Sequence, residues 1–252
     1  MTDSLRCLTQ EQVTDFQRRG YLRIGRVFEG EQLAELRSDY DRVFAEARES
    51  ADMRNLSSSD GEITTPADEE LLQIMQVCER SMLFRRLLYD ERVLDVAEDL
   101  IGPNLQLFHD QALFKPAHHG GPISWHQDNA YWRCEPANLV SCWMTLDDVD
   151  VDNGAMQVIP GSHRGTLEHE RDEDSLLLDR GEQVDDTDAV IVELPAGGIM
   201  FHHCQTLHHT ARNTTNRQRR AFAIHFMNPG TRRSDGTEME VSFSRPLLRL
   251  RA

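Results

Sequence analysis

Residues 206–227 read Thr206-Leu-His-His-Thr-Ala-Arg-Asn-Thr-Thr-Asn-Arg-Gln-Arg-Arg-Ala-Phe-Ala-Ile-His-Phe-Met227. Two β-rich segments in this stretch flank a turn of Asn and Thr residues at 213–216. Alternate side chains of a strand share a face, so Thr210 keeps the parity of His208, and Arg219 keeps that of the two alanines that follow it. The stretch therefore predicts a hairpin that presents a histidine, a hydroxyl and an arginine on one wall of a β-barrel.

Short β-rich segments also precede this hairpin, separated by turn residues such as Asp152-Asn-Gly154 and Pro195-Ala-Gly-Gly198. They are residues 105–114, 123–126, 139–146, 155–159, 189–194 and 199–203. Eight short strands at this spacing predict an antiparallel double sheet, the cupin-like jelly-roll or double-stranded β-helix. We therefore expect a single domain over residues 1–252 with three regions. The second region is the jelly-roll core at 104–229, and the third is a C-terminal tail at 230–252.

Residues 1–103 form the first region, expected to be mainly helical and to support the barrel from outside. A capping-box pattern, Thr9-Gln-Glu-Gln12, precedes a helix that ends at Gly20, and a second helix is expected over 31–49. Helical periodicity also runs through 69–99. Residues 50–68 lose this period and collect Ser, Asp, Gly and Pro, which indicates a long loop that serves as a lid.

The composition narrows the function. The chain has 27 Lys and Arg against 43 Asp and Glu, a formal net charge of −16, which disfavours nucleic acid and membrane surfaces as partners and favours a small-molecule substrate. Its sole lysine, Lys115, has no Gly-rich loop beside it, so lysine catalysis and a P-loop are nearly excluded. Five scattered cysteines and the lack of a signal peptide or membrane span favour a cytoplasmic protein.

The segment Trp125-His-Gln-Asp128 suggests a metal site, because His126 and Asp128 would share one face of an extended strand. Two histidines and one carboxylate with open coordination positions favour non-haem Fe(II), whereas zinc usually takes more His or Cys ligands. The third ligand is expected from 202–225, where the candidates are His202, His203, His208, His209 and His225. A 2-oxoglutarate cosubstrate needs a bidentate cation for its distal carboxylate, and Arg219, following His208 in the hairpin, favours His208.

The ordered set of motifs resembles the phytanoyl-CoA dioxygenase family of Fe(II)/2-oxoglutarate oxygenases. The resemblance covers residues 105–227 and rests on Trp125-His-Gln-Asp128, Trp143, Asp152-Asn-Gly154, Val158-Ile-Pro-Gly-Ser-His163 and the closing motif. That motif spaces His, Ser or Thr, Asn, Ser or Thr, and Arg as His208, Thr210, Asn213, Thr215 and Arg219 stand here. His209 would break every one of these offsets.

The resemblance implies iron ligation by His126, Asp128 and His208. It implies that Arg219 binds 2-oxoglutarate with help from the Thr210 hydroxyl, and that Gln111 and Trp143 line the cosubstrate pocket. Fe(II), 2-oxoglutarate and O₂ would be required, with succinate and CO₂ as products. Relatives that halogenate have a small residue in place of the carboxylate ligand, so Asp128 favours hydroxylation.

The substrate is not identified by the sequence, and neither is the oligomeric state. Candidates for the substrate wall are Asn129, Tyr131 and Trp132, which follow the Asp ligand, together with the lid at 50–68. Lys115 is expected to be a surface charge at the end of a strand, with a cation facing an anionic substrate or the cosubstrate rim as the alternative. The competing function is a cupin-like barrel that binds a metal for non-redox work, as an isomerase, lyase or metabolite-binding module.

Overall fold

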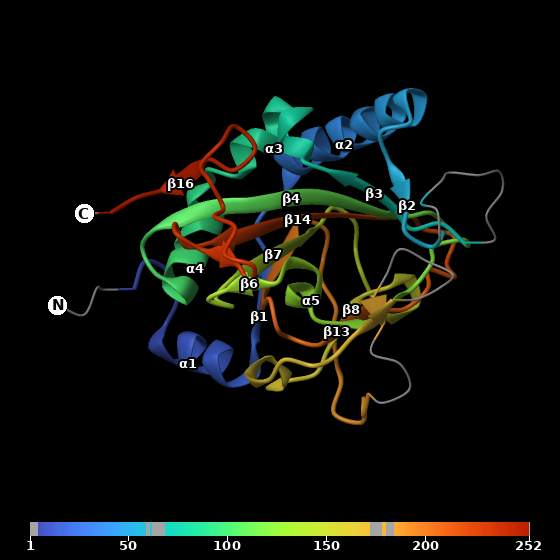
Figure 1. The fold of residues 1–252 in the computed structure, drawn as a ribbon. Helices are drawn as coiled ribbons and strands as arrows, with labels where there is room; N and C mark the ends of the chain where they lie inside the picture. Colours follow the sequence, from blue (N-terminus) through green and yellow to red (C-terminus); the bar gives the residue numbers. More distant parts are fainter. Residues whose placement is uncertain (1–4, 59–60, 62–68, 172–177, 180–183, 252) are drawn as a thin grey trace.

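The computed structural model describes residues 5–58, 61, 69–171, 178–179 and 184–251. Two antiparallel sheets face each other in it (Figure 1). The large sheet contains β1 (Tyr21–Arg26), β2 (Arg54–Asn55), β3 (Leu72–Met75), β4 (Leu105–Lys115), β7 (Val140–Thr145), β12 (Gly198–His203), β14 (Arg219–Met227) and β16 (Leu247–Arg249). The small sheet contains β5 (Ile123–His126), β8 (Met156–Val158), β11 (Val190–Val192) and β13 (His208–Thr210).

The strand order confirms the predicted jelly-roll. It is β1-β12-β7-β14-β4-β3-β2 in the large sheet, with β16 beside β4, and β11-β8-β13-β5 in the small one. All eight segments that the sequence marked as β-rich are strands, with ends that agree within two residues. Two short pairs complete the β structure, β6 (Cys134–Glu135) with β15 (Arg232–Arg233) and β9 (Glu170–Arg171) with β10 (Leu178–Asp179).

The large sheet has one face toward the helices and one toward the small sheet. On β14, Phe222, Ile224 and Phe226 belong to the core beneath the helices, whereas Ala221 and Ala223 belong to the core between the sheets. On β7, Met144 and Trp143 divide in the same way. Since the inward residues of β14 include small alanines, space remains between the sheets.

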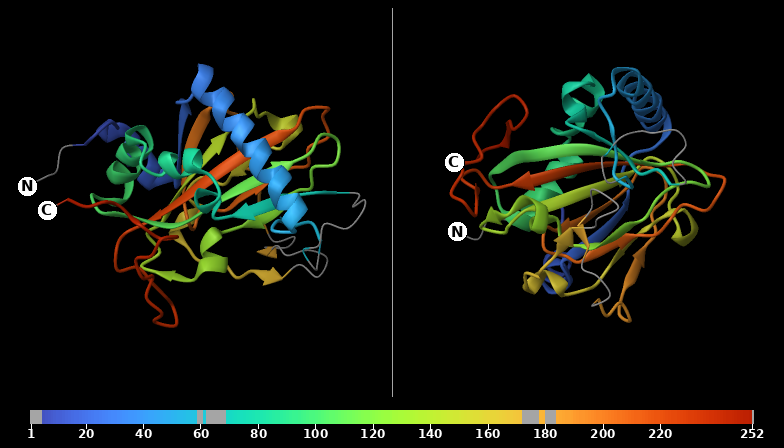
Figure 2. Two further views of the ribbon diagram at one scale, coloured as in Figure 1. Left: turned by 90° about the horizontal axis from the view of Figure 1, so that it is seen from above. Right: turned by 45° about the vertical axis from the view of Figure 1, so that its right-hand side comes forward.

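The helices cover the outer face of the large sheet, where α2 (Gly30–Ser50) runs across the strands (Figure 2). The predicted first helix is α1 (Gln10–Arg19), and its capping box is present: the Thr9 side chain accepts from the Gln12 amide, and the Gln12 side chain accepts from the Thr9 amide. Gly20 ends it in the left-handed conformation. Two further helices lie on either side of the break expected near Asp90: α3 (Met82–Leu87) ends before it, and α4 (Glu91–Ile101) begins directly after it.

The N-terminal region also contributes three strands to the large sheet, and one of them, β3, lies where the sequence predicted helical structure over 69–99. β1 pairs with β12, and β3 lies between β4 and β2. The sequence Leu72-Gln-Ile-Met75 alternates buried and partly buried residues, a strand pattern. Its apolar residues also fit a helical period, and only pairing with the edge of β4 decides between the two.

The predicted hairpin was also wrong, because its two strands belong to different sheets. β13 pairs with β5 and β8, whereas β14 pairs with β4 and β7. The connecting segment passes from one sheet to the other and is held by Asn213, whose amide donates to the carbonyls of Arg217 at 2.6 Å and Pro116 at 3.1 Å. The turn residues were recognised correctly, but they make a crossing between sheets.

Part of the expected lid at 50–68, namely 59–60 and 62–68, lies outside the described residues. The C-terminal tail adds β15 and β16 to the β structure. Among the residues that the structure describes, no helix is long and apolar enough to cross a membrane.

Candidate metal centre

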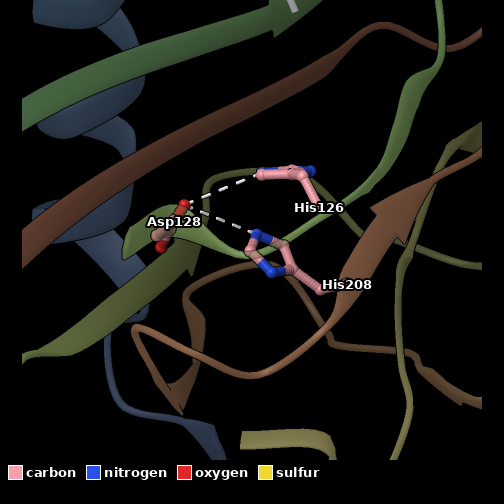
Figure 3. Close-up of side chains that lie close together, drawn as sticks. All are labelled: His126, Asp128 and His208. Carbon is pink, nitrogen blue, oxygen red and sulfur yellow. Dashed lines mark ion pairs between the residues drawn. The ribbon is translucent and has the colours of Figure 1, made fainter. Parts of the chain in front are cut away.

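Three side chains that the sequence singled out meet between the sheets (Figure 3). His126 ends β5, His208 begins β13, and the antiparallel register sets the two residues opposite each other. Nε2 of His126 and Nε2 of His208 each lie 3.7 Å from Oδ1 of Asp128. The three ligand atoms are within 4.8 Å of one another, which is the spacing of one shared ion.

Backbone carbonyls set the tautomer of both histidines. Nδ1 of His126 lies 2.8 Å from the Ser124 carbonyl oxygen, and Nδ1 of His208 lies 2.8 Å from that of Thr206. A carbonyl only accepts, so each Nδ1 carries the proton and each Nε2 offers its lone pair toward Asp128. This is the arrangement by which metal-binding histidines are oriented in proteins. The donor set, two neutral imidazole nitrogens and a carboxylate, fits a divalent first-row metal such as Fe(II).

Asp128 reaches this point by a route that the sequence did not predict. It begins the short helix α5 (Asp128–Trp132), so it does not share an extended strand with His126. Between them Gln127 is buried, and its amide donates to the carbonyls of Gly165 at 2.8 Å and Gln205 at 2.7 Å. Because Gln127 is anchored on this side, the chain turns immediately after His126 and directs Asp128 back to the histidines.

The protonation states suit metal binding. Burial, followed by the neighbouring His126, lowers the pKa of His208 well below its usual range, so its imidazole is neutral at neutral pH. Burial on its own would raise the pKa of Asp128, but the surrounding histidines, His208 foremost, hold it well below the usual range. A neutral imidazole beside an ionised carboxylate is the state that a cation requires.

A chain of hydrogen bonds leads away from the other oxygen of Asp128. Ser141 Oγ donates to Oδ2 of Asp128 at 3.1 Å and lies 2.7 Å from Nδ1 of His225. The amide of Gln111 donates to Nε2 of His225 at 3.1 Å, so His225 carries its proton on Nδ1 and donates it to Ser141. Burial lowers the pKa of His225 to about 4, which keeps this ring neutral.

A cavity of about 680 Å³ opens onto the three ligands. Arg219 lines it and is only 1% exposed, yet its Nε and Nη2 have no hydrogen-bond partner among the residues that the structure describes. The hydroxyl of Thr210 is buried in the same wall, also without a partner in the described part of the chain. Burial lowers the pKa of Arg219 to about 10, so the guanidinium stays charged. A buried, unpaired cation needs an anion, and the distal carboxylate of 2-oxoglutarate matches this fork of donors.

Most of the other predicted site residues line this cavity as well: Gln111, Trp143, Tyr131 and Trp132. Asn129 does not, because its side chain is bonded to the backbone of Cys134, accepting from the amide at 2.9 Å and donating to the carbonyl at 3.3 Å. From the expected lid, the described residues Arg54 and Leu56 contribute to the lining.

Lys115 is fully buried, which corrects the expectation of a surface charge. Its ammonium donates to the backbone carbonyls of Thr210, at 3.3 Å, and of Ala211, and it is not part of the cavity lining. Burial, followed by the charge of Arg219, lowers the pKa of Lys115 well below its usual range. The side chain therefore ties the end of β4 to the end of β13, so that it links the two sheets.

Several cavity residues lie outside the predicted site. His202, one of the candidates considered for the third ligand, faces the centre, with Nδ1 3.9 Å from Oδ2 of Asp128. Because His202 is two residues after Met200, an inward residue of β12, strand alternation indicates that His202 also faces inward. His109, Arg233 and Arg245 also line the cavity. The two arginines come from the C-terminal tail, and the strand pattern of the core does not predict where the tail lies.

The family model for phytanoyl-CoA dioxygenase (PhyH) matches residues 16–221 of the chain. The peroxisomal phytanoyl-CoA dioxygenase of Mus musculus is 29% identical over 232 residues, which are 87% of this chain and 68% of the mouse protein. An ectoine dioxygenase of Bordetella bronchiseptica is 26% identical over 226 residues, covering 82% of this chain and 71% of its own.

A solved structure shares the fold over almost the whole chain. It is that of the epimerase SnoN in complex with Fe³⁺, α-ketoglutarate and nogalamycin RO, with a TM-score of 0.79 and 22% identity. The match covers 95% of this chain and 98% of SnoN. At this identity the likeness concerns the fold, so the roles of individual residues must be argued from the site.

Proposed function

The chain belongs to the phytanoyl-CoA dioxygenase family, and from that premise we propose that it is an Fe(II)/2-oxoglutarate-dependent oxygenase that hydroxylates a C–H bond of a small molecule. The observation that carries the proposal is the pairing of two features in one cavity. Asp128, His126 and His208 supply a metal-binding set, and Arg219 supplies a buried cation with unpaired donors beside it. A non-redox metal barrel would leave that cation without a counter-ion, which disfavours the competing function.

Each residue has a defined task in this proposal. When bound, Fe(II) with 2-oxoglutarate and O₂ supplies an oxidant for a C–H bond and releases succinate and CO₂. His126, Asp128 and His208 hold the metal, while Arg219 and Thr210 bind and orient the cosubstrate through its distal carboxylate. Trp143, whose ring centroid lies 5.7 Å from Cζ of Arg219, covers the guanidinium and excludes water from it. A carboxylate at position 128 keeps the third protein ligand, which favours hydroxylation over halogenation.

The rest of the cavity is assigned to the substrate. Tyr131 lies at the entrance, 39% exposed, with its ring edge-on to His126 at 5.7 Å between centroids. Trp132 lies deeper, with its ring 5.0 Å from that of Phe108. These aromatic rings offer an apolar wall beside the metal ligands. The five cysteines are free, which fits the reducing conditions of a cytoplasm.

The test is anaerobic visible spectroscopy of the protein with Fe(II) and 2-oxoglutarate, in which a chelated cosubstrate produces a weak charge-transfer band. We expect the band in the wild-type protein and its loss in Arg219→Ala, with recovery only at about 100-fold more 2-oxoglutarate. The matched control is Arg217→Ala, which removes an exposed arginine that pairs with Asp150 at 2.6 Å. No band in the wild type, or the same loss in the control, would contradict the proposal.

Substrate oxidation is tested separately. Succinate release across a panel of metabolites identifies compounds that couple to turnover, and mass spectrometry of the product then reports the reaction. A product heavier by one oxygen atom supports hydroxylation. A product of unchanged mass or with two fewer hydrogens would leave the oxygenase class intact and refute hydroxylation.

A further inference from the structure

The cavity is positively charged although the chain as a whole is strongly negative. The described residues that line it include Arg54, Arg219, Arg233 and Arg245, whereas Asp128 is the single carboxylate among them. In a chain with a formal net charge of −16, this concentration of arginine opposes the overall composition. Cavities lined by one sign of charge attract ligands of the opposite sign.

Two of these arginines lie together at the end of the cavity near α5. Arg233 is on β15, which pairs with β6, and Nε of Arg245 donates to the carbonyl of Phe108 at 3.1 Å. Burial raises the pKa of the Cys134 thiol to about 11, and the positive charges of Arg233 and Arg245 both oppose that rise. Both guanidinium groups therefore lie close enough to Cys134 to influence it. Within the described part of the chain, neither arginine forms an ion pair within 4 Å.

When the metal and 2-oxoglutarate are bound, the charges around them balance without Arg233 and Arg245. The metal contributes two positive charges, Asp128 one negative, the cosubstrate two negative and Arg219 one positive, so the catalytic set sums to zero. The fourth arginine, Arg54, is engaged elsewhere: it donates to the amide oxygen of Gln73 at 2.6 Å, across the pair that β2 and β3 form at one edge of the large sheet. Among the described residues, Arg233 and Arg245 therefore line the remaining space without an ion pair; Arg233 is exposed, and the acidic group it influences is Asp235, whose pKa it helps to lower.

We propose that the substrate carries an anionic group, a carboxylate or phosphate, which Arg233 and Arg245 bind while Trp132 and Phe108 contact its apolar body. This inference rests on the proposed function and names the substrate class of the same site. Guanidinium groups bind both types of oxyanion through paired N–H donors, and the adjacent rings supply the apolar contact. Both arginines follow residue 221, where the match to the family model ends, so this selectivity belongs to the tail of this chain.

The test is isothermal titration calorimetry with three probes that share one aromatic body: phenylacetate, benzylphosphonate and the neutral phenylacetamide. The protein is loaded with 2-oxoglutarate and with Zn(II), which does not turn over, so that Arg219 is already occupied. We expect at least one anion to bind the wild type about tenfold more tightly than the amide, equivalent to about 1.4 kcal/mol. The preferred anion distinguishes a carboxylate from a phosphate group.

The variants locate the effect. Arg233→Gln/Arg245→Gln should reduce the anion to the affinity of the amide, whereas Arg232→Gln should behave as wild type. Arg232 is the neighbour of Arg233 on β15, is exposed, and pairs with Glu238 at 2.6 Å. Equal binding of amide and anions by the wild type, failure of both anions to bind, or an anion preference that survives the double substitution would overturn the proposal.

The iron and 2-oxoglutarate spectrum of the same proteins separates this inference from the proposed function. A normal band in the double variant, together with lost anion preference, supports a substrate site distinct from the cosubstrate site. Absence of the band in the wild type counts against the oxygenase itself, whatever the probes show. A band that disappears only in the double variant would assign the two arginines to the cosubstrate and overturn the inference.

Discussion

Ser141 donates a hydrogen bond of 3.1 Å to Oδ2 of Asp128, while Oδ1 of the same carboxylate faces His126 and His208. Ser141 is itself fixed by His225, whose Nδ1 lies 2.7 Å away. The carboxylate is therefore held from behind, with one oxygen committed to the protein and one free for a metal. Such support orients a ligand before the ion arrives.

Removing this support should weaken metal binding without removing a ligand. Ser141→Ala is expected to lower the affinity for Fe(II), or for Co(II) as a stable substitute, by about tenfold. Calorimetric titration of the metal measures it. Thr145→Val is the control, because it deletes another buried hydroxyl of β7, one that contacts the carbonyls of Pro195 and Gly198. Equal metal affinity in Ser141→Ala and wild type would contradict the role of Ser141.

Two adjacent histidines should differ sharply in their effect on metal binding. His208→Ala is expected to reduce metal affinity more than about 100-fold, since it deletes one of three ligands. His209→Ala should change it less than about threefold, because Nδ1 of His209 bonds to the Ile123 carbonyl at 3.1 Å and its ring packs on Trp125. Metal titration of both variants decides the matter, and a comparable loss in the two would refute the assignment of His208.

Asp110 should make stability depend on pH. The residue is fully buried, its Oδ1 accepts from the Cys78 amide at 3.0 Å, and its Oδ2 has no hydrogen-bond partner within the described ranges. Burial raises its pKa from 3.8 to about 6, so between these values the folded state binds more protons than the unfolded state. The contribution of Asp110 to stability therefore decreases as pH rises through this window, and the penalty is complete above it.

Asp110→Asn should remove that penalty while keeping an acceptor for the Cys78 amide. We expect the Asn variant to be more stable than wild type by about 3 kcal/mol at pH 7.5, with the difference disappearing toward pH 4. Urea unfolding of both proteins at the two pH values measures this. A variant less stable than wild type at pH 7.5 would show that the ionised carboxylate is compensated.

Gly197 should tolerate no side chain. Its φ is +76°, and a Cβ there would lie 1.8 Å from the carbonyl oxygen of Phe28. Its own carbonyl accepts from the amides of Val27 and Phe28, which attaches the segment before α2 to the barrel. Gly197→Ala combines backbone strain with a backbone clash and should cost more than about 3 kcal/mol.

The control for this substitution is Gly25→Ala. Gly25 also has a positive φ, +99°, but a Cβ at this position would meet no atom of the described residues within 4 Å. Only the backbone strain remains, at about 1 to 2 kcal/mol. Thermal unfolding of both variants separates the two contributions, and similar losses would show that the Phe28 carbonyl moves aside.

The eight predicted strands of the jelly-roll, and the three side chains that meet as a candidate metal site, could be predicted from the amino-acid sequence. Strands were readable because alternation and turn residues are local properties, as in Asp152-Asn-Gly154. The candidate metal ligands could be predicted because His126, Asp128 and His208 stand at characteristic spacings in an ordered set of motifs. Neither inference required knowledge of which strands pair.

How those side chains meet, and what surrounds them, depends on strand pairing and on contacts between distant parts of the chain. Asp128 reaches the site through a helical turn anchored by Gln127, and Arg219 reaches it from the other sheet, because pairing across the fold outweighs local pattern. Lys115 is buried because the carbonyls of Thr210 and Ala211 lie within its reach, contacts separated by 95 residues or more in the chain. Arg233 and Arg245 likewise depend on long-range contacts, because these residues of the C-terminal tail line the cavity only in the folded chain.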